Sequence, residues 1–352
     1  MSLQATVGYI PLTDCAPLVI AKELGFFQQY GVNVDLQAQR SWATLREKLH
    51  AGVLDAAQVL APLPFASQLG LDTVATDVIA PMVLSLNGNA ITLSNYLCTE
   101  IKSANSIKDI NLPMAAYLLE KVITRRKRKG ASKLRFASVF PYSCHFYQLC
   151  EWLKSGGVSM SDVDLTIVTS DSMISALHNG EIDGYCAGGP WNAKAVRAGL
   201  GTTVLTSYDI WRESPEKVLG LLGSFYRHNP ATVYAICRGL KQACQWLASI
   251  PNRFEAACIL SQSKYLDAPI EVVAPSLLGS CLIDLKHSPR EVPDYNQFHS
   301  KFVDINSPTQ SSRDWLLQQM LTTGQVSQAQ VDSLKVGQVF RADIYAEAML
   351  GL

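Results

Sequence analysis

Polar side chains that could hold an anion stand in the sequence where helices begin. Ser41 precedes the apolar-periodic stretch 42–50 and is predicted to cap a helix there, and the first backbone N–H groups of that helix are then free to bind an anion. Trp42 could lay its ring against such a ligand or donate from its indole N–H, but it could equally pack on the core as a hydrophobic staple. The chemistry that this pair favours is binding rather than bond breaking.

Two further candidates stand where strands end. Gln58 follows a short strand predicted to begin at Asp55, and an amide at a strand end would point into a cleft. Asn87 and Gly88 interrupt the largely apolar stretch 83–86, so a short amide and a backbone N–H could face a ligand there. The alternative at both places is an ordinary turn.

The middle of the chain repeats this arrangement. Five candidates share a position just after a predicted strand: Tyr142, Ser143, His145, Pro190 and Trp191. Ser143 could cap a helix predicted over 146–153, which places the first group at another helix start. The alternatives are a hydrogen bond within the core for His145 and core packing for Trp191.

The motifs of catalysis and metal binding are missing from the sequence. It contains no GxxxxGK[ST], GxGxxG, GxSxG or HExxH, and its six histidines are scattered without ligand spacing. Nine cysteines, an odd number with no CxxC pair, are typical of reduced thiols packed as small hydrophobes. The sequence therefore predicts a protein that is not an enzyme and has no cofactor and no metal site.

Alternating strands and helices would position these candidates. A strand over 7–10 precedes a helix over 15–24, and a strand over 32–36 precedes the helix 42–50, which ends at Gly52. Strands that alternate with helices imply parallel βαβ units, so the predicted fold class is α/β.

The sequence also resembles itself at an offset of 128 positions. Leu49–Asp55 aligns with Leu177–Asp183, and Pro62 aligns with Pro190. Leu, His, Gly, Asp and Pro recur at the same relative positions, as two α/β lobes of one plan would produce, although chance could also produce five matches. The period is too long for a solenoid.

From about Ser214 the pattern becomes helical. Five helices are predicted in this part of the chain, over 230–249, 252–261, 268–279, 311–323 and 326–336. Earlier, the basic run Arg125–Lys129 is predicted to be a solvated loop before a strand over 136–139. Its alternative is a contact with an acidic protein or RNA, but no aromatic residues are interleaved with the basic ones.

Composition limits the class of protein. The chain has 352 residues, typical of about two domains, with 48% hydrophobic and 17% charged residues and a net charge of zero. A global basic field for nucleic acid, extensive disorder and a membrane helix are all excluded. The first Lys or Arg is Lys22 and no signal peptide is visible, so a cytoplasmic protein is expected.

Segments along nearly the whole chain resemble, in order, the nitrate/nitrite/bicarbonate-binding proteins of ABC transporters, of the NrtA and CmpA type. Within that group the chain is most similar to the NasS type of cytoplasmic nitrate sensor. The segments that carry the resemblance are Gly8–Leu18, Ala21–Phe27, Ser41–Leu49, Gly52–Pro64, Asn87–Ser94, Phe140-Pro141 with His145, Pro190–Asn192, Asp209–Trp211, Pro215–Leu219, Trp246, Asn252-Arg253 and Phe340–Tyr345.

The resemblance implies a bilobal Venus-flytrap fold of the type II periplasmic-binding class, with a helical C-terminal region. We expect residues 1–92 and 205–352 to form one lobe and 93–204 the other. It implies nitrate or nitrite as the ligand, with Trp42, Gln58, Asn87 and Gly88 as contacts from one lobe. The 142–145 turn and Pro190-Trp191 are the implied contacts from the other lobe. The implied partner is a NasT-like antiterminator with an RNA-binding ANTAR domain, sequestered by the sensor and released when ligand binds. No direct contact with nucleic acid or membrane is expected.

Two departures from the family pattern affect the expected ligand. Transport proteins of the group have His-Gly where this chain has Asn87-Gly88, and an acidic residue where it has Gly189. The resemblance assigns that acidic residue a metal-supporting role in bicarbonate binders, so its absence argues against calcium-assisted bicarbonate binding. The alternatives kept open are the substrate-binding protein of an ABC transporter and a thiamine-pyrimidine-synthesis enzyme on the same fold.

Overall fold

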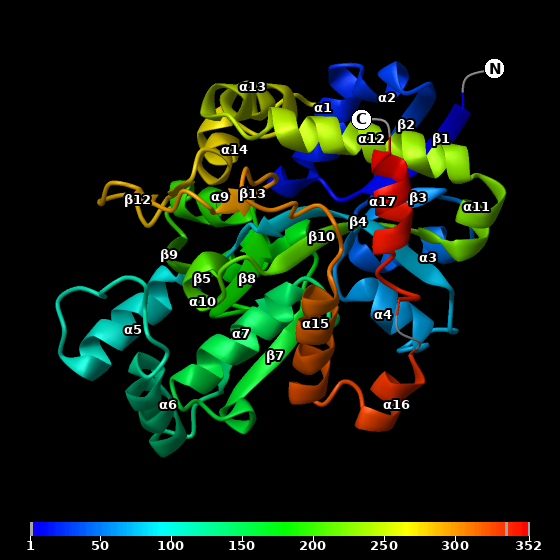
Figure 1. Ribbon diagram of the computed structural model, residues 1–352. Coiled ribbons are helices and arrows are strands. Elements are labelled where there is room, and N and C mark those ends of the chain that lie inside the picture. Colours follow the sequence, from blue (N-terminus) through cyan, green and yellow to red (C-terminus); the bar gives the residue numbers. More distant parts are fainter. Residues whose placement is uncertain (1–2, 335–336, 351–352) are drawn as a thin grey trace.

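The computed structural model describes residues 3–334 and 337–350, and these form two α/β lobes, each around its own sheet (Figure 1). The first sheet has the strand order β13-β4-β10-β3-β1-β2 and the second has the order β7-β6-β8-β5-β9. The strands of the first sheet are β1 Leu3–Tyr9, β2 Val32–Ala38, β3 Ala56–Leu60, β4 Val78–Asn87, β10 Pro215–Leu222 and β13 Asn296–Gln297. Those of the second are β5 Asn89–Ser94, β6 Leu134–Ser138, β7 Val163–Ile167, β8 Gly184–Gly188 and β9 Gly201–Thr206, and β11 Ser280–Cys281 pairs with β12 Arg290–Glu291.

Helices cover the sheets in three groups, each with its own apolar core. The helices packed on one face of the first sheet are α1 Ala16–Glu23, α2 Phe26–Gln29, α12 Pro230–Trp246, α13 Ile250–Leu260, α14 Ile270–Leu277 and α17 Ala342–Met349. Those around the apolar core between the lobes are α3 Trp42–His50, α4 Leu63–Gln68, α8 Met173–His178, α9 Trp191–Arg197 and α15 Gln310–Thr322. The second lobe is completed by α5 Asn95–Asn105, α6 Leu118–Arg128 and α7 Cys144–Ser155, and the shorter helices are α10 Ser207–Ile210, α11 Gly223–His228 and α16 Gln328–Ser333.

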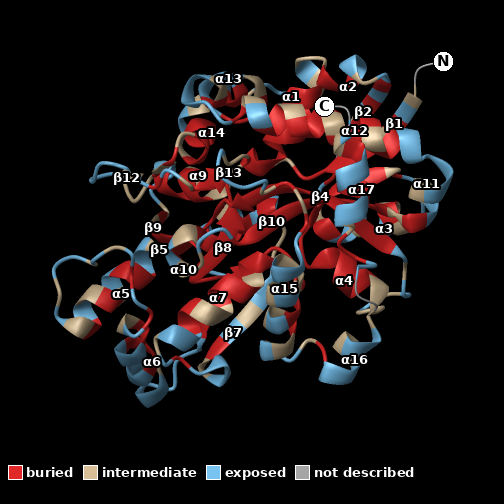
Figure 2. Cartoon of the chain, in the orientation of Figure 1, coloured by how far each residue is buried: buried red, intermediate tan, exposed pale blue. Residues whose placement is uncertain are grey.

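Figure 2 shows the buried residues concentrated in the two sheets and the helix faces turned toward them, while α5, α6 and α16 expose much of their surface. The core between the lobes contains side chains from both, including Trp42 and Leu45 from α3 and Tyr142 and Tyr147 from around α7. The lobes are therefore packed against each other through apolar contacts. No helix within residues 3–334 and 337–350 is long and apolar enough to cross a membrane.

The chain passes between the two sheets at two adjacent places. β4 continues into β5 through Gly88, and the chain returns through α10 and Ser214 into β10. The backbone N–H of Asn87 donates to the Ser214 carbonyl (2.9 Å), and that of Asn89 donates to Ser207 Oγ (3.2 Å). The two crossings are thus hydrogen-bonded to each other.

The internal repeat is confirmed as a shared local structure. The backbone N–H of Asp55 donates to the Thr6 carbonyl (2.9 Å) and its Oδ2 accepts from the Thr6 N–H (2.8 Å). In the second lobe, the backbone N–H of Asp183 donates to the Arg135 carbonyl (2.7 Å), and Asp183 Oδ2 accepts from the Arg135 N–H (2.8 Å). Each aspartate joins the strand after its helix to the preceding parallel strand, β3 to β1 and β8 to β6.

The glycines of the repeat also have equivalent roles. Gly52 and Gly180 end their helices with φ of 69° and 66°, a left-handed conformation that glycine adopts without strain. The aligned prolines Pro62 and Pro190 occupy the N-cap positions of α4 and α9. The predicted α/β fold of two similar lobes is confirmed.

Most predicted elements are found within a few residues of their predicted bounds, with one clear exception. The helix 42–50 is α3, and its Ser41 Oγ accepts from the Thr44 N–H as expected of an N-cap. The prediction of a loop at 125–129 was wrong, because most of that run forms the last turn of α6, where Arg126 pairs with Glu100 (2.7 Å). Of the helix predicted over 326–336, residues 335–336 lie outside the described part of the chain.

Candidate functional site

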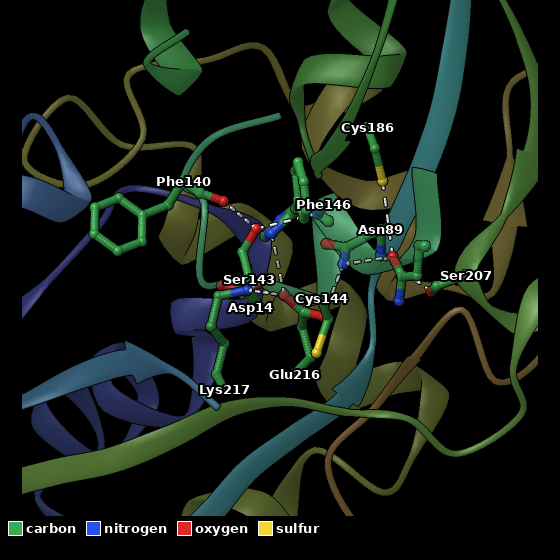
Figure 3. Close-up of polar contacts among 12 residues, drawn as sticks. Asp14, Asn89, Phe140, Ser143, Cys144, Phe146, Cys186, Ser207, Glu216 and Lys217 are labelled. Atoms are coloured by element: carbon green, nitrogen blue, oxygen red, sulfur yellow. Dashed lines mark hydrogen bonds and ion pairs between the residues drawn. The ribbon is translucent and has the colours of Figure 1, made fainter. Parts of the chain in front are cut away.

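A lysine buried between the two lobes is the centre of the candidate site. Lys217 on β10 is 0% exposed, and its Nζ lies 2.8 Å from Asp14 Oδ2 and 2.7 Å from Glu216 Oε1 (Figure 3). The same Nζ lies 5.5 Å from the centroid of the Trp42 ring. A buried ammonium group is tolerated only when it is well paired, and here two carboxylates pair it.

Amide side chains extend this group of charges into both lobes. Gln58 Nε2, on β3, donates to Asp14 Oδ1 (2.9 Å). Asn89 Nδ2, on β5 of the second sheet, donates to Glu216 Oε2 (2.7 Å) and to Gln148 Oε1 (3.0 Å). We refer to the whole set as the inter-lobe cluster, and its members are Asp14, Trp42, Gln58, Asn89, His145, Gln148, Glu216 and Lys217.

The start of α7 brings a histidine to the cluster. Ser143 caps this helix, since its Oγ accepts from the Phe146 N–H (3.1 Å) and donates to the Phe140 carbonyl (2.6 Å). The cap places His145 in the first turn, 0% exposed, with its Nδ1 3.5 Å from Glu216 Oε1. That distance is a contact rather than a hydrogen bond.

Burial and charge shift the pKa values of three cluster residues. Burial alone would lower the pKa of Lys217, but Asp14 and Glu216 outweigh it and raise that pKa, so the ammonium stays charged. Burial raises the pKa of Glu216, and the neighbouring Lys217 opposes this only in part. Burial, with Lys217 close by, holds the pKa of His145 well below its usual value, so the imidazole is neutral at neutral pH.

Several polar atoms of the cluster remain unsatisfied. Considering only described residues, five of its buried side chains have atoms without a hydrogen-bond partner: Trp42 Nε1, Gln58 Oε1, Asn89 Oδ1, both ring nitrogens of His145, and Asp14 Oδ2, which is ion-paired with Lys217. Buried polar groups are nearly always bonded, so such a concentration requires an explanation. Two of these groups carry an N–H that could donate to a bound anion, next to the Lys217 charge.

The structure does not bring all the predicted residues into this cluster. Asn87 Nδ2 donates to the Asp294 carbonyl (3.0 Å), and its Oδ1 accepts from the Ser214 N–H (3.3 Å), so its amide is used where the chain crosses between the lobes. At Gly88, with φ of 102°, a Cβ would lie 2.4 Å from Asn296 Oδ1. The positions of both residues are therefore explained by the crossing.

Three other predicted residues also lie elsewhere. Tyr142 OH donates to Asp72 Oδ2 (2.6 Å), a hydrogen bond from one lobe to the other. Pro190 and Trp191 line a separate cavity of about 360 Å³, which we call the outer cavity. Of the predicted residues, only Trp42, Gln58 and His145 belong to the cluster, and Ser143 positions His145.

Five cluster residues were not predicted: Asp14, Asn89, Gln148, Glu216 and Lys217. A signal for two of them was present, because Glu216-Lys217 is a charged pair inside the otherwise apolar strand Pro215–Leu222. Such a pair must find buried partners, which are Asp14 and Asn89. Gln148 had no comparable signal, since an amide on an amphipathic helix is usually solvated.

The two lobes and the polar cluster between them define the chain as a bilobal protein of the periplasmic-binding class. It belongs to the NMT1-like family, whose model matches residues 2–261. It superposes on the crystal structure of the periplasmic nitrate-binding protein NrtA from Synechocystis PCC 6803 with a TM-score of 0.88 and 26% identity. The match covers 99% of this chain and 88% of the NrtA chain. The predicted type II periplasmic-binding fold is thereby confirmed.

Relatives with curated names are longer than this chain. The nitrate import ATP-binding protein NrtC of Synechocystis sp. (strain ATCC 27184 / PCC 6803 / Kazusa) is 33% identical over 97% of this chain and 49% of its own length. The nitrate/nitrite binding protein NrtA of Synechococcus elongatus (strain ATCC 33912 / PCC 7942 / FACHB-805) is 29% identical over 97% of this chain and 76% of its own length. The chain thus spans about half the length of the NrtC relative and about three quarters of the NrtA relative.

Proposed function

We propose that the inter-lobe cluster binds a small monovalent oxyanion, nitrate or nitrite, and that the bound ion holds the two lobes together. The observation that carries this proposal is Lys217, a buried cation next to two side chains with unsatisfied N–H groups, Trp42 and His145. Because Asp14 and Glu216 already pair with Lys217, the neutral N–H donors must supply much of the binding, which suits an ion of single charge better than one of two charges. The names of the relatives NrtA and NrtC, a nitrate/nitrite binding protein and a nitrate import protein, support the same ligand.

The environment of Gly189 supports nitrate over metal-assisted bicarbonate. A Cβ at this position would lie 2.6 Å from Thr13 Oγ1 and 2.7 Å from Ser276 Oγ. An acidic side chain here would have to displace both hydroxyl groups. The chain therefore has no room for the carboxylate that the resemblance associates with calcium in bicarbonate binders.

We further propose that the chain is a cytoplasmic sensor whose partner is a NasT-like ANTAR antiterminator. In this scheme the ligand-free protein sequesters the antiterminator, and nitrate or nitrite releases it to act on the leader RNA of nitrate-assimilation genes. The support is the resemblance of the sequence to the NasS type and its departures from the transport proteins at Asn87 and Gly189. The mechanism requires that ligand and partner prefer different lobe arrangements, since equal affinity for both would shift nothing.

The second candidate is the substrate-binding component of a nitrate, nitrite or bicarbonate transporter. It is favoured by the relatives, among which NrtA is periplasmic and NrtC is an import protein. The two candidates make the same demand on the cluster and differ in the partner. A mixture of the purified chain with an ANTAR antiterminator separates them: the sensor forms a complex that nitrate dissociates, and a transport component forms none.

Calorimetric titration with nitrate, nitrite, bicarbonate and sulfate tests the ligand. We expect nitrate or nitrite to bind, and sulfate, with its second charge, and bicarbonate to bind at least tenfold more weakly. The absence of binding by both nitrogen oxyanions would contradict the proposal.

Trp42→Phe provides a sharper test of the cluster. The substitution keeps an aromatic ring in the core and removes the unpartnered indole N–H. If that group donates to the ligand, affinity should fall by about 2- to 13-fold, equivalent to about 0.5–1.5 kcal/mol for one hydrogen bond. The matched control is Trp246→Phe, on α12 and outside the cluster, which should leave the affinity unchanged.

A further inference from the structure

The outer cavity is formed by both lobes but shares no residue with the inter-lobe cluster. Its walls include Ile10 and Arg40, which follow β1 and β2 of the first sheet, and Ser170, Trp191 and Lys194 of the second lobe. Its volume of about 360 Å³ lies within the roughly 300–1,000 Å³ range of small-molecule sites. A three- or four-atom anion would leave most of that space empty.

Positive charge predominates in this cavity. Among the described residues, neither Arg40 nor Lys194 has a carboxylate within ion-pair distance, and Lys194 Nζ lies 4.3 Å from the centroid of the Trp191 ring. Among the described residues that line the cavity, Asp171 has the one carboxylate, and it already accepts from Thr169 Oγ1 (2.6 Å). Burial lowers the pKa of Lys194, and only the charge of Asp267 opposes this. A bound anion would supply the partner that the ammonium group lacks.

Two buried polar groups of the wall are also unsatisfied. Ser170 is 6% exposed, and its Oγ has no hydrogen-bond partner in the described part of the chain; the same is true of Trp191 Nε1. Both can donate to an oxygen atom. The cavity therefore combines two free cations, two free donors and the aromatic side chains of Trp191 and Tyr265.

We propose that the outer cavity is a second binding site, for a small organic anion that carries a carboxylate and a planar ring. The carboxylate pairs with Lys194 and accepts from Ser170 or the Trp191 indole, and the ring packs among the aromatic and apolar walls. This site does not depend on the nature of the ion in the inter-lobe cluster. Because both lobes line it, an anion bound there stabilises the same closed arrangement, so its binding and that of nitrate should strengthen each other.

The test uses 4-fluorobenzoate as the probe, with ¹⁹F NMR titration of the full chain, and the uncharged 4-fluorobenzamide as the matched ligand. We expect the carboxylate to bind at least tenfold more tightly than the amide. Lys194→Gln and Arg40→Gln should each weaken the binding of 4-fluorobenzoate, and Lys194→Gln should do so by at least tenfold. The control Lys121→Gln, which removes an exposed lysine of α6, should have no effect.

Three results would overturn the proposal: no binding of 4-fluorobenzoate, equal binding of acid and amide, or unchanged affinity in both Lys194→Gln and Arg40→Gln. Addition of nitrate distinguishes one site from two. Nitrate should tighten the binding of 4-fluorobenzoate; an unchanged affinity would contradict the coupling of the two sites, and competitive displacement would show that both ligands share one cleft. Failure of nitrate to bind would count against the proposed function and leave the result at the outer cavity intact.

Discussion

The ammonium group of Lys217 is enclosed by two carboxylates, and the balance of charge around it explains why the strand that carries it can be buried. Removing the cation would leave Asp14 and Glu216 buried next to each other without compensation. We expect Lys217→Met to lower the free energy of unfolding by about 3–5 kcal/mol, as is usual when one partner of a buried ion pair is lost. Urea unfolding at pH 7 measures the effect.

The control for that experiment is a pair on the surface. Lys264 lies 3.0 Å from Glu23 with half of its side chain exposed, so Lys264→Met should cost no more than about 1 kcal/mol. A Lys217→Met protein as stable as the wild type would show that the two carboxylates do not depend on the lysine.

Glu216 makes ligand binding depend on pH. Its pKa is raised, mainly by burial, and a bound anion would raise it further, so binding takes up a proton. The affinity for nitrate should therefore be highest at low pH and should fall as the pH rises through the pKa of Glu216 in the folded protein, above its ordinary value. His145 stays neutral as the pH rises and does not reverse this trend.

Glu216→Gln should abolish this dependence, because the amide cannot titrate. The measurement is calorimetric titration with nitrate between pH 5 and 8, in two buffers of different ionisation enthalpy to detect the proton. An affinity of the wild type that is constant or increases with pH would contradict the assignment of Glu216 to the ligand site.

At the scale of the elements, the two aspartates of the repeat each fasten a strand to its parallel neighbour. Asp55→Ala would leave the Thr6 N–H without its acceptor, and Asp183→Ala would do the same to the Arg135 N–H. We expect each substitution to lower the free energy of unfolding by about 1–3 kcal/mol. Asp183→Ala should lower the free energy of unfolding more than Asp55→Ala, since Arg126 and Arg135 also lie 3.6 and 3.8 Å from the Asp183 carboxylate. Urea unfolding gives both values.

The matched control is Asp35→Ala, on the exposed face of β2, where the carboxylate accepts only from the neighbouring Gln37 side chain. It should change stability by less than about 0.5 kcal/mol. Equal small effects at all three positions would mean that the repeat is a similarity of sequence without a structural role.

Local signals explain which elements the sequence predicts well. The bounds of α3 could be predicted because Ser41 and Gly52 mark its two ends. In the run 125–129 four of the five side chains are exposed, as its charges suggest, but most of the run continues α6 instead of forming a loop. Arg126 in this turn pairs with Glu100 on another helix, a contact that no local pattern shows. For the same reason most of the cluster could not be predicted: Lys217 is held by Asp14, about 200 residues away, and no local pattern connects them.

Across the whole molecule, contacts between the lobes fix their relative position. An apolar core is shared by both lobes. Gln325, after α15, joins the second lobe to the C-terminal region by accepting from Tyr147 OH (2.8 Å) and donating to the Pro141 carbonyl (2.8 Å). These contacts need α7 to lie against the first lobe and α15, so they would be lost if the lobes parted. A ligand between the lobes would favour the same arrangement.

The hydrogen bond from Tyr142 to Asp72 gives the clearest way to weaken this arrangement without touching the cluster. Tyr142→Phe removes a single hydroxyl whose partner, Asp72, can be hydrated when the lobes part. A bond of about 0.5–1.5 kcal/mol shifts the equilibrium between open and closed lobes by about 2- to 13-fold, and nitrate affinity can fall by no more than that factor. Small-angle scattering should show a larger radius of gyration for the ligand-free variant and the wild-type value when ligand is saturating.

Asp72→Ala removes the same hydrogen bond from the other lobe, so it should have the same effect. The double variant should bind nitrate no more weakly than either single variant. That pattern would identify the bond itself, rather than the packing of the ring, as the contribution of Tyr142. If Tyr142 instead contacted the ligand, Tyr142→Phe would lower affinity while Asp72→Ala would not, and the ligand-free radius of gyration would stay at the wild-type value. The two single variants thus separate a residue that closes the lobes from one that binds the ion.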